Sequence, residues 1–349
     1  MQAQNRLDSN RMDYVSLIHA LLEGRELDPD QCSFALQELS NSDWSDVKKS
    51  AFLSLLQSKG ATGNELAGFA SSMREKAAKV SLGASQLVDT CGTGGGHPSF
   101  NISTAAAIVA AAAGAKVAKH GNRSVTSKCG SADVLESLGV KLTSEPEKLL
   151  HIFERTGFAF FFAPNHHSAT KGVAEVRKEL GFRTIFNLLG PLANPAGANR
   201  QVIGVYDARF VQPVAHALQK LGAERAIVAH GAEGLDEISP CGETVCVLLD
   251  GEKCAPTILT PTDFGVDAVP KLALEPGESV EENAKILLES LTDPESLRAA
   301  AIVPSAAAAI WAFGLSSTFQ EAASFAHSAI RTGKARETLE TLIEVSSSI

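Results

Sequence analysis

A glycine-rich loop between an apolar run and an alanine-rich helix is the first place where this sequence could do chemistry. The loop begins at Gly92 and ends at Ser103 and Thr104, directly before the apolar run 105–113. Closely spaced glycines let backbone N–H groups approach an anion, and the N-terminus of the next helix adds about half a positive charge. The spacing is not that of a dinucleotide-binding loop, because His97 stands where the third glycine belongs, and it is not a Walker loop. A phosphate cradle is therefore predicted, with a plain flexible turn as the alternative.

A second cluster of polar side chains follows the next apolar run. Lys119, His120 and Asn122 surround a glycine turn, and Ser131 comes soon after. Lys119 could supply a point charge for a diphosphate, and Asn122 could offer both a donor and an acceptor to a planar polar substrate. A solvated turn before a capped helix explains these residues equally well.

Two adjacent carboxylates, Asp236 and Glu237, lie in a turn opened by Gly234, just after another strand-like run. Neighbouring carboxylates repel each other, so this turn indicates a counter-cation. Oxygen ligands that face phosphate favour Mg²⁺ over zinc. A solvated turn is again the alternative.

The segment that starts at Pro164 contains adjacent histidines, His166 and His167, followed by Arg177 on a helix. Adjacent side chains rarely share one ion and no further ligand follows at a helical spacing, so zinc is not expected here. A helical arginine is usually a surface charge, but its fork is also the best receptor for a carboxylate. Hydrolytic motifs, such as Gly-x-Ser-x-Gly or His-Glu-x-x-His, are absent.

Four amphipathic helices are expected over residues 12–80. Asp28 with the following proline opens the second, Gly60 stops the third, and a capping box that starts at Thr62 opens the fourth. No strand signal lies between them. Residues 1–82 are therefore predicted to form a small all-helical domain for packing and oligomer contacts.

After Leu82 short apolar runs alternate with helical stretches. Strands are expected at 86–90, 115–119, 158–163, 201–206, 225–229 and 244–249, and helices near 104–113, 132–138, 146–155, 168–180 and 211–221. Such alternation indicates right-handed crossovers and a mostly parallel sheet with helices on both faces. We therefore expect an α/β fold: a small N-terminal all-helical domain and a larger α/β domain, residues 83–349, with a central, mostly parallel sheet. Ligands bind such sheets at the carboxyl ends of the strands.

The composition is that of a globular chain without an excess of positive charge. The 349 residues carry 31 Lys and Arg against 40 Asp and Glu, a formal net charge of −9, and 44% of them are hydrophobic. Proteins that bind nucleic acid or anionic membranes need an excess of Lys and Arg, so neither partner is expected. The six scattered cysteines and the polar opening, residues 1–10, favour a cytoplasmic protein. The apolar run 105–113 is too short to span a bilayer, and the run 299–315 is expected to break at Pro304.

The conjunction of these segments resembles the anthranilate phosphoribosyltransferase family, a glycosyltransferase family. The segments that carry the resemblance are Gly92-Thr-Gly-Gly95, Phe100-Asn-Ile-Ser-Thr104, Val117-Ala-Lys-His-Gly-Asn-Arg-Ser124, Gly130-Ser-Ala-Asp-Val-Leu-Glu136, Arg177 with Asn187-Leu-Leu-Gly-Pro-Leu192, and Gly234-Leu-Asp-Glu-Ile-Ser239. They occur in family order over nearly the whole chain. The resemblance implies transfer of the phosphoribosyl group of phosphoribosyl pyrophosphate (PRPP) to the amine of anthranilate, a step of tryptophan synthesis. It also implies a homodimer built through the helical domain and the helix near 168–180.

The resemblance implies roles for individual residues. It assigns PRPP contacts to Gly92, Thr93, Gly94, Gly95, Asn101, Ser103, Thr104, Lys119 and Ser131. It assigns anthranilate contacts to Gly92, His120, Asn122, Arg177, Gly190 and Pro191, with Arg177 on the carboxylate. It assigns two Mg²⁺ ions per site to Ser103, Asp236 and Glu237.

The glycine loop departs from the family pattern. The family usually has Gly-Thr-Gly-Gly-Asp-Gly, where the aspartate helps to hold PRPP, but Gly96 stands at that position here. A donor on His97 is expected to restore a phosphate contact and give a different grip on PRPP. Two alternatives stay open: a pyrimidine nucleoside phosphorylase, which takes free phosphate and a nucleoside, and a non-catalytic relative that binds nucleic acid. The second would need a basic surface, which a net charge of −9 does not favour.

Overall fold

The computed structural model describes residues 12–41, 43–124 and 128–348. The polar opening, residues 1–10, on which the expectation of no leader rests, lies outside the described residues. The described chain begins with the four predicted helices: α1 (Tyr14–Leu22), α2 (Pro29–Ser40), α3 (Asp46–Lys59) and α4 (Gly63–Lys76).

The predicted helix boundaries of this part are confirmed by the capping contacts. Asp28 caps α2, whose first residue is a proline, and α3 ends at Gly60, which has φ +83°. In the capping box of α4, the N–H of Glu65 donates to the Thr62 hydroxyl (3.2 Å) and the N–H of Thr62 donates to the Glu65 carboxylate (2.9 Å). The buried Glu65 also pairs with Lys59 at 2.7 Å, so this carboxylate is satisfied inside the bundle.

A seven-stranded sheet forms the centre of the molecule, in the order β3-β2-β1-β4-β5-β6-β7. Its strands are β1 (Val88–Gly92), β2 (Val117–Gly121), β3 (Phe158–Phe162), β4 (Arg200–Gly204), β5 (Arg225–Gly231), β6 (Thr244–Asp250) and β7 (Lys253–Leu259). The first five strands in this order pair in parallel. Strand β6 pairs antiparallel with β5, and β7 pairs antiparallel with β6. The predicted α/β class is confirmed, with a mixed rather than wholly parallel sheet.

The strands that lead into the polar loops end later than predicted. β1 reaches Gly92, which pairs with Gly204 of β4, and β2 reaches Gly121. The expected ends at residues 90 and 119 were wrong because parallel pairing with neighbouring strands extends through these glycines. Gly92 and His120 are therefore fixed by the sheet, and only the residues after them form the loops.

The helices between the strands cover both faces of the sheet. They are α5 (Ile102–Ala112), α6 (Ser131–Ser137), α7 (Pro146–Thr156), α8 (Ala163–His166), α9 (Ala174–Leu180), α10 (Phe186–Leu192) and α11 (Val211–Lys220). The single helix expected over 168–180 was wrong: a 3₁₀ turn, η1 (Ser168–Val173), precedes α9. The 3₁₀ turn contains Thr170, Gly172 and Val173, which are weak α-helix formers. A Cβ on Gly172 would lie 2.7 Å from the carbonyl carbon of Ser40, so this turn packs tightly on α2.

Four C-terminal helices, which the sequence analysis did not assign, complete the described chain: α12 (Val280–Thr292), α13 (Leu297–Phe313), α14 (Phe319–Arg331) and α15 (Lys334–Ser348). The expected break at Pro304 was wrong, because α13 runs through this proline. Within the described residues no single helix has the length and apolarity to cross a membrane, although α12 and α13, bent by 75°, pass that test as a pair.

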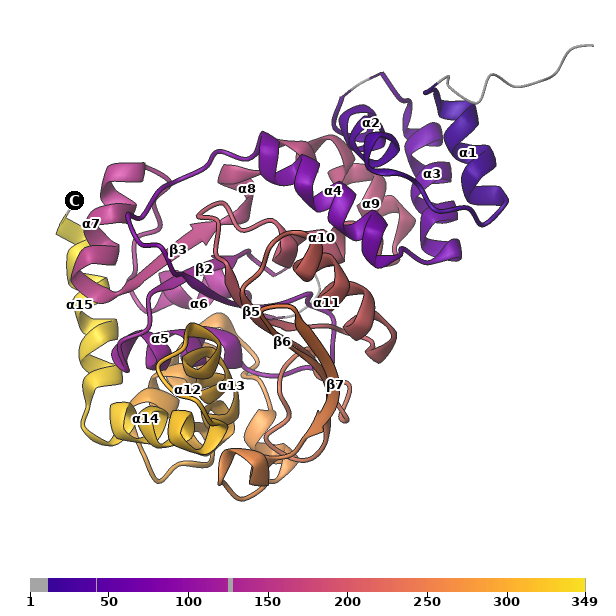
Figure 1. Ribbon diagram of the computed structural model, residues 1–349. Coiled ribbons are helices and arrows are strands. Elements are labelled where there is room, and N and C mark those ends of the chain that lie inside the picture. The colour runs from indigo at the N-terminus through magenta and orange to yellow at the C-terminus, as the bar shows by residue number, and fades with distance from the viewer. Residues whose placement is uncertain (1–11, 42, 125–127, 349) are drawn as a thin grey trace, which may run out of the picture.

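Two apolar layers lie on opposite faces of the sheet. One joins α5 to the C-terminal helices α12–α15, and the other joins the sheet to α10, α11 and the N-terminal helices. Figure 1 shows the yellow C-terminal helices on one side of the sheet and α4, α10 and α11 on the other. The polar loops therefore meet at the edge of the sheet between these layers.

Candidate active site

The glycine loop after β1 and the carboxylate turn after β5 are in direct contact. The N–H of Gly94 donates to Asp236 Oδ2 (2.7 Å), and the N–H of Ser103 donates to Glu237 Oε1 (3.1 Å). The N–H of His97 donates to the Gly234 carbonyl at 2.7 Å. The residues predicted to bind phosphate therefore lie next to the residues predicted to bind metal.

Gly96, the departure from the family pattern, has no room for a side chain in this loop conformation. A Cβ there would lie 2.7 Å from both the backbone nitrogen and Oδ1 of Asp236, and 2.8 Å from the carbonyl oxygen of Gly234. Real Cβ atoms do not approach other atoms so closely. The loop thus packs against the carboxylate turn in a way that an aspartate at position 96 would prevent. The exposed His97 ring contacts the carbonyl of Pro98 (3.0 Å).

Lys119 lies beneath the same loop. Its side chain is 1% exposed, and its ammonium donates to the Ser103 hydroxyl (3.3 Å) and to the Thr90 carbonyl. Burial lowers the pKa of Lys119, while the negative charge of Asp89 raises it. The lysine is therefore a fixed, buried donor below the start of α5.

Asp89 is a site-supporting residue that the sequence analysis missed. Its carboxylate accepts the N–H of His120 (3.0 Å) and the side-chain amide of Asn194 (2.8 Å). Burial raises its pKa to about 6, and Lys119 opposes that shift. Only its position within an otherwise apolar strand marks Asp89 in the sequence, and such a residue commonly has a purely structural role.

The paired carboxylates have the chemistry of a divalent-cation site. Burial raises the pKa of Glu237 to about 8, with a further contribution from Asp236, and burial also raises the pKa of Asp236. Two such acids with one lysine nearby are short of positive charge, and the Ser103 hydroxyl adds a third hard oxygen ligand. No group of three or more His, Cys, Asp or Glu side chains converges within the described ranges. Asp236, Glu237 and the Ser103 hydroxyl offer hard oxygen atoms that fit Mg²⁺, which binds few protein ligands and completes its shell with water and phosphate oxygens.

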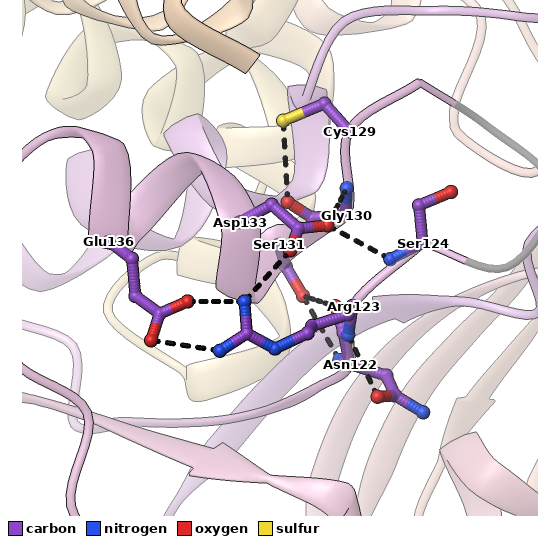
Figure 2. A network of polar contacts seen from close by, with 8 residues as sticks. All are labelled: Asn122, Arg123, Ser124, Cys129, Gly130, Ser131, Asp133 and Glu136. Carbon is purple, nitrogen blue, oxygen red and sulfur yellow. Dashed lines mark hydrogen bonds and ion pairs between the residues drawn. The ribbon is translucent and has the colours of Figure 1, made fainter.

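The turn after β2 is tied to the start of α6 (Figure 2). The Ser131 hydroxyl accepts the N–H of Asn122 and donates to its carbonyl, both at 3.2 Å. The guanidinium of Arg123 pairs with Asp133 (3.2 Å) and Glu136 (2.6 Å). These contacts fix Asn122 and Ser131 relative to each other.

Two predicted residues at the start of α5 carry buried polar atoms for which no protein partner is found among the described residues. They are Asn101 Oδ1 and Thr104 Oγ1. The amide nitrogen of Asn101 donates to the Cys129 carbonyl (3.2 Å), which fixes the direction of its oxygen. Both oxygens are thus placed to bind a ligand at the start of the helix.

Arg177 belongs to a second group of residues, gathered around α10. Its guanidinium donates to Asn187 Oδ1 (3.4 Å) and lies 5.5 Å from the ring centre of Phe186, and burial lowers its pKa. The carbonyl of Gly190, in the same helix, accepts from His120 Nδ1 (3.0 Å). Helix α10 thus connects Arg177 with His120 of β2, the strand that also contains Lys119.

The imidazole of His120 is neutral, with one free nitrogen. Burial lowers its pKa to about 3, and its contact with the Gly190 carbonyl requires the proton on Nδ1. Its Nε2 is buried and has no protein partner among the described residues. The ring packs edge-on against His167, with 5.1 Å between ring centres.

Pro191, next to Gly190, is held by Gln201, whose amide donates to its carbonyl (2.8 Å).

Arg183, in the connection between α9 and α10, is a second residue that the sequence analysis missed. Its guanidinium donates to the carbonyl of Gly95 and lies 4.3 Å from the ring centre of Tyr206. No motif marks it, because a single exposed arginine has no distinctive spacing.

Sequence comparison agrees with this fold. The profile of the glycosyl transferase family α/β domain matches residues 84–336, and the profile of its helical bundle domain matches residues 15–77. The fold and site therefore define a glycosyl transferase with a helical bundle and an α/β domain. The anthranilate phosphoribosyltransferase of Ectopseudomonas mendocina is 41% identical over 96% of this chain and 97% of its own length. The chain belongs to the anthranilate phosphoribosyltransferase family, as the sequence resemblance indicated.

Solved structures of this family share the fold over nearly their whole length. The enzyme from Thermus thermophilus superposes with a TM-score of 0.88 at 38% identity, covering 95% of this chain and 99% of its own. The Saccharomyces cerevisiae enzyme in complex with PRPP and Mg gives a TM-score of 0.84 at 27% identity, covering 98% and 99%. The same yeast enzyme in complex with 4-fluoroanthranilate gives a TM-score of 0.83 at 26% identity, covering 97% and 99%.

Proposed function

We propose that this chain transfers the phosphoribosyl group of PRPP to the amine of anthranilate, giving N-(5-phosphoribosyl)anthranilate and pyrophosphate in tryptophan biosynthesis. The observation that carries the proposal is the contact between the glycine loop, the buried Lys119 and the pair Asp236 and Glu237. Such a group of N–H donors, ammonium and carboxylates suits a metal-bound diphosphate. The named relatives extend this chemistry to anthranilate as acceptor.

The PRPP side of the site comprises Gly92, Thr93, Gly94, Gly95, Asn101, Ser103, Thr104, Lys119 and Ser131 in this proposal. The N-terminus of α5 and the ammonium of Lys119 provide positive potential for phosphate oxygens. Among the described residues Asn101 Oδ1 and Thr104 Oγ1 have no partner; the amide oxygen can accept from a ribose hydroxyl, and the threonine hydroxyl can donate to a phosphate oxygen. As the ribose C1–O bond breaks, negative charge grows on the leaving diphosphate, and Lys119 stabilises it without moving, because the ammonium is already fixed.

Ser103, Asp236 and Glu237 would hold two Mg²⁺ ions per site. When bound, the metal supplies charge neutralisation and Lewis acidity on the diphosphate oxygens. The raised carboxylate pKa values and the hard oxygen ligands support this assignment. The yeast relative has been solved in complex with PRPP and Mg, which supports Mg²⁺ as the metal.

The anthranilate side comprises Gly92, His120, Asn122, Arg177, Gly190 and Pro191. The fork of Arg177 suits the carboxylate of the acceptor, and its partial burial strengthens that contact. An aryl amine is neutral at pH 7 and needs no strong base before it attacks. Positioning by Arg177 and Asn122 therefore supplies much of the rate.

We also propose that the chain works as a cytoplasmic homodimer built through the N-terminal helices. Apolar side chains with no cover lie on this part of the described chain: Val15 (52% exposed), Leu22 (63%) and Val47 (79%). The first two are seven residues apart on one face of α1. The six scattered cysteines, which include no Cys-x-x-Cys pair, favour the cytoplasm.

Anthranilate fluorescence, followed over time in the presence of PRPP and Mg²⁺, tests the proposed reaction. Fluorescence should fall because the ribosylated product is less fluorescent, and the fall should require both PRPP and Mg²⁺. No depletion of anthranilate by a folded protein would contradict the proposal. Phosphorolysis of thymidine or uridine without PRPP would assign the chain to the nucleoside phosphorylases instead.

A further inference from the structure

An arginine outside the predicted site lies against the glycine loop. The Nη2 atom of Arg183 donates to the carbonyl of Gly95. A Cβ built on Gly95 would lie 2.7 Å from Nε of Arg183 and 2.9 Å from Cζ. The guanidinium therefore covers the α-carbon of this glycine, and only a residue without a side chain fits beneath it.

The guanidinium is itself held in place. Its Cζ lies 4.3 Å from the ring centre of Tyr206, and the ring packs against Phe210 with 5.2 Å between centres. The backbone N–H of Tyr206 donates to the Thr93 hydroxyl (3.0 Å), so the supporting residue also contacts the loop. A planar guanidinium can stack on an aromatic ring and donate a hydrogen bond in its own plane at the same time.

The loop is gripped at two successive residues by groups of opposite charge. Asp236 accepts the N–H of Gly94 (2.7 Å), and Arg183 donates to the carbonyl of Gly95. Gly94 and Gly95 have φ of +70° and +79°, one of several conformations open to glycine, so contacts from outside the loop select it. Burial raises the pKa of Asp236, and the positive charge of Arg183 opposes that shift.

The chain on the C-terminal side of Arg183 is equally fixed. The N–H of Thr184 donates to Asn187 Oδ1 (3.1 Å), which also accepts from Arg177 (3.4 Å). Arg183 thus extends from a firmly held segment, although its own side chain is exposed. These contacts therefore fix the exposed Arg183 side chain beside the glycine loop.

We propose that Arg183 is a positioning residue that holds Gly94 and Gly95 in the shape that binds the diphosphate of PRPP. This inference deepens the proposed function and rests on it. The contact that Arg183 makes with the Gly95 carbonyl fixes the direction of the following N–H groups before the substrate arrives. Pre-organised donors cost no reorganisation when they bind an anion.

Hydrogen exchange of the ligand-free protein tests this role without any reaction. In Arg183→Met, the amides of residues 94–97 should exchange about tenfold faster than in the unaltered chain, because a hydrogen bond to a charged group is lost. Arg209→Met is the matched control: Arg209 is also exposed, pairs with Asp207 (3.1 Å) and lies 4.8 Å from an aromatic ring centre, that of Phe210. The control should leave the exchange of 94–97 unchanged. Equal protection in Arg183→Met and the unaltered chain would overturn the inference.

Steady-state kinetics provides the second readout. Arg183→Met should raise the KM for PRPP about tenfold while the KM for anthranilate changes much less. Arg183→Lys keeps the charge but not the flat fork, so it should restore neither the KM nor the slow exchange. A raised KM with normal exchange would show that Arg183 acts as a simple charge for the substrate and overturn the positioning role. Full rescue of both by lysine would overturn the part assigned to the planar guanidinium. If the unaltered chain consumes no anthranilate, the proposed function fails, while the exchange experiment still decides whether Arg183 positions the loop.

Discussion

The ammonium nitrogen of Lys119 lies 3.3 Å from the hydroxyl oxygen of Ser103, to which it donates. Lys119 comes from β2, and Ser103 comes from the first turn of α5. The ammonium is buried, with Asp89 nearby as the counter-charge that raises its pKa. A buried lysine is costly unless its charge is compensated. Its place under the glycine loop therefore points to the binding of a highly charged ligand.

Lys119→Met should lower kcat by about 100-fold or more, because a fixed positive group that faces developing charge is lost. The variant also leaves Asp89 without its lysine, so the free energy of unfolding should fall as well. The anthranilate fluorescence assay measures kcat, and urea unfolding measures the free energy of unfolding separately. Lys116→Met, at an exposed position just before β2, is the control and should change neither quantity much. A near-normal kcat in a folded Lys119→Met protein would remove Lys119 from the site.

Arg177→Ala should raise the KM for anthranilate by about 10- to 100-fold, because a charge-assisted contact to a carboxylate is lost. The KM for PRPP should change far less, since Arg177 lies with α10 and not with the glycine loop. Lys178→Ala, one residue further along α9 and exposed, is the control for lost charge. Equal changes in both KM values would reject the role of Arg177.

Two buried imidazoles should each lower the free energy of unfolding of the ligand-free protein in acid, while Asp89 and Glu237, whose pKa values burial raises, act in the opposite direction. Burial lowers the pKa of His120 to about 3 and that of His167 to about 4, so both are neutral when folded and take up a proton on unfolding below about pH 6.5. Their stabilising contribution is complete above pH 6.5 and is lost as the pH falls toward 4. The loss should reach up to about 1.4 kcal/mol per pH unit for each imidazole.

Urea unfolding at pH 7, 6 and 5 measures how steeply the free energy of unfolding changes with pH. In His167→Gln the free energy of unfolding should change less steeply with pH, by about 1.4 kcal/mol per pH unit, because one fewer proton is taken up on unfolding. His151→Gln, at an exposed position of α7, serves as the control and should keep the slope of the unaltered chain. An unchanged slope in His167→Gln would show that this imidazole does not carry the effect.

Gly96→Asp, which would introduce the residue usual in the family, should weaken PRPP binding in this chain. Its Cβ would collide with the backbone nitrogen of Asp236, and its carboxylate would stand beside that of Asp236. The KM for PRPP should rise about tenfold, as expected for the loss of one or two kcal/mol of binding free energy. Gly96→Ala separates the two causes, since it introduces the collision without the charge. A lower KM in Gly96→Asp would mean that the loop moves freely away from Asp236.

Much of the site could be predicted because chemistry-bearing residues follow strands. Gly92 ends β1, Lys119 lies within the short strand β2, and Asp236 lies in the turn after β5; a parallel sheet brings the carboxyl ends of its strands to one edge. The sequence pattern could not predict how tightly these loops pack. The contact of Gly94 with Asp236 joins residues 142 positions apart, and no local periodicity reports it.

The missed elements have physical reasons. Strand β7 contains Pro256 and has exposed residues on both faces, which is tolerated at the edge of a sheet but resembles a loop in the sequence. Helix α13 continues through Pro304, because the helix is enclosed by the core and its buried packing outweighs the cost of one proline. Asp89 and Arg183 act through contacts with residues distant in the chain and leave no pattern in the sequence.

A crystal structure of the chain with PRPP and Mg²⁺ tests the central claim most directly, since it locates the diphosphate itself. The account predicts the diphosphate against the glycine loop and Lys119, with metal about 2.1 Å from oxygens drawn from Ser103, Asp236 and Glu237. A diphosphate bound away from this loop, with Asp236 and Glu237 contacting neither metal nor ligand, would contradict it.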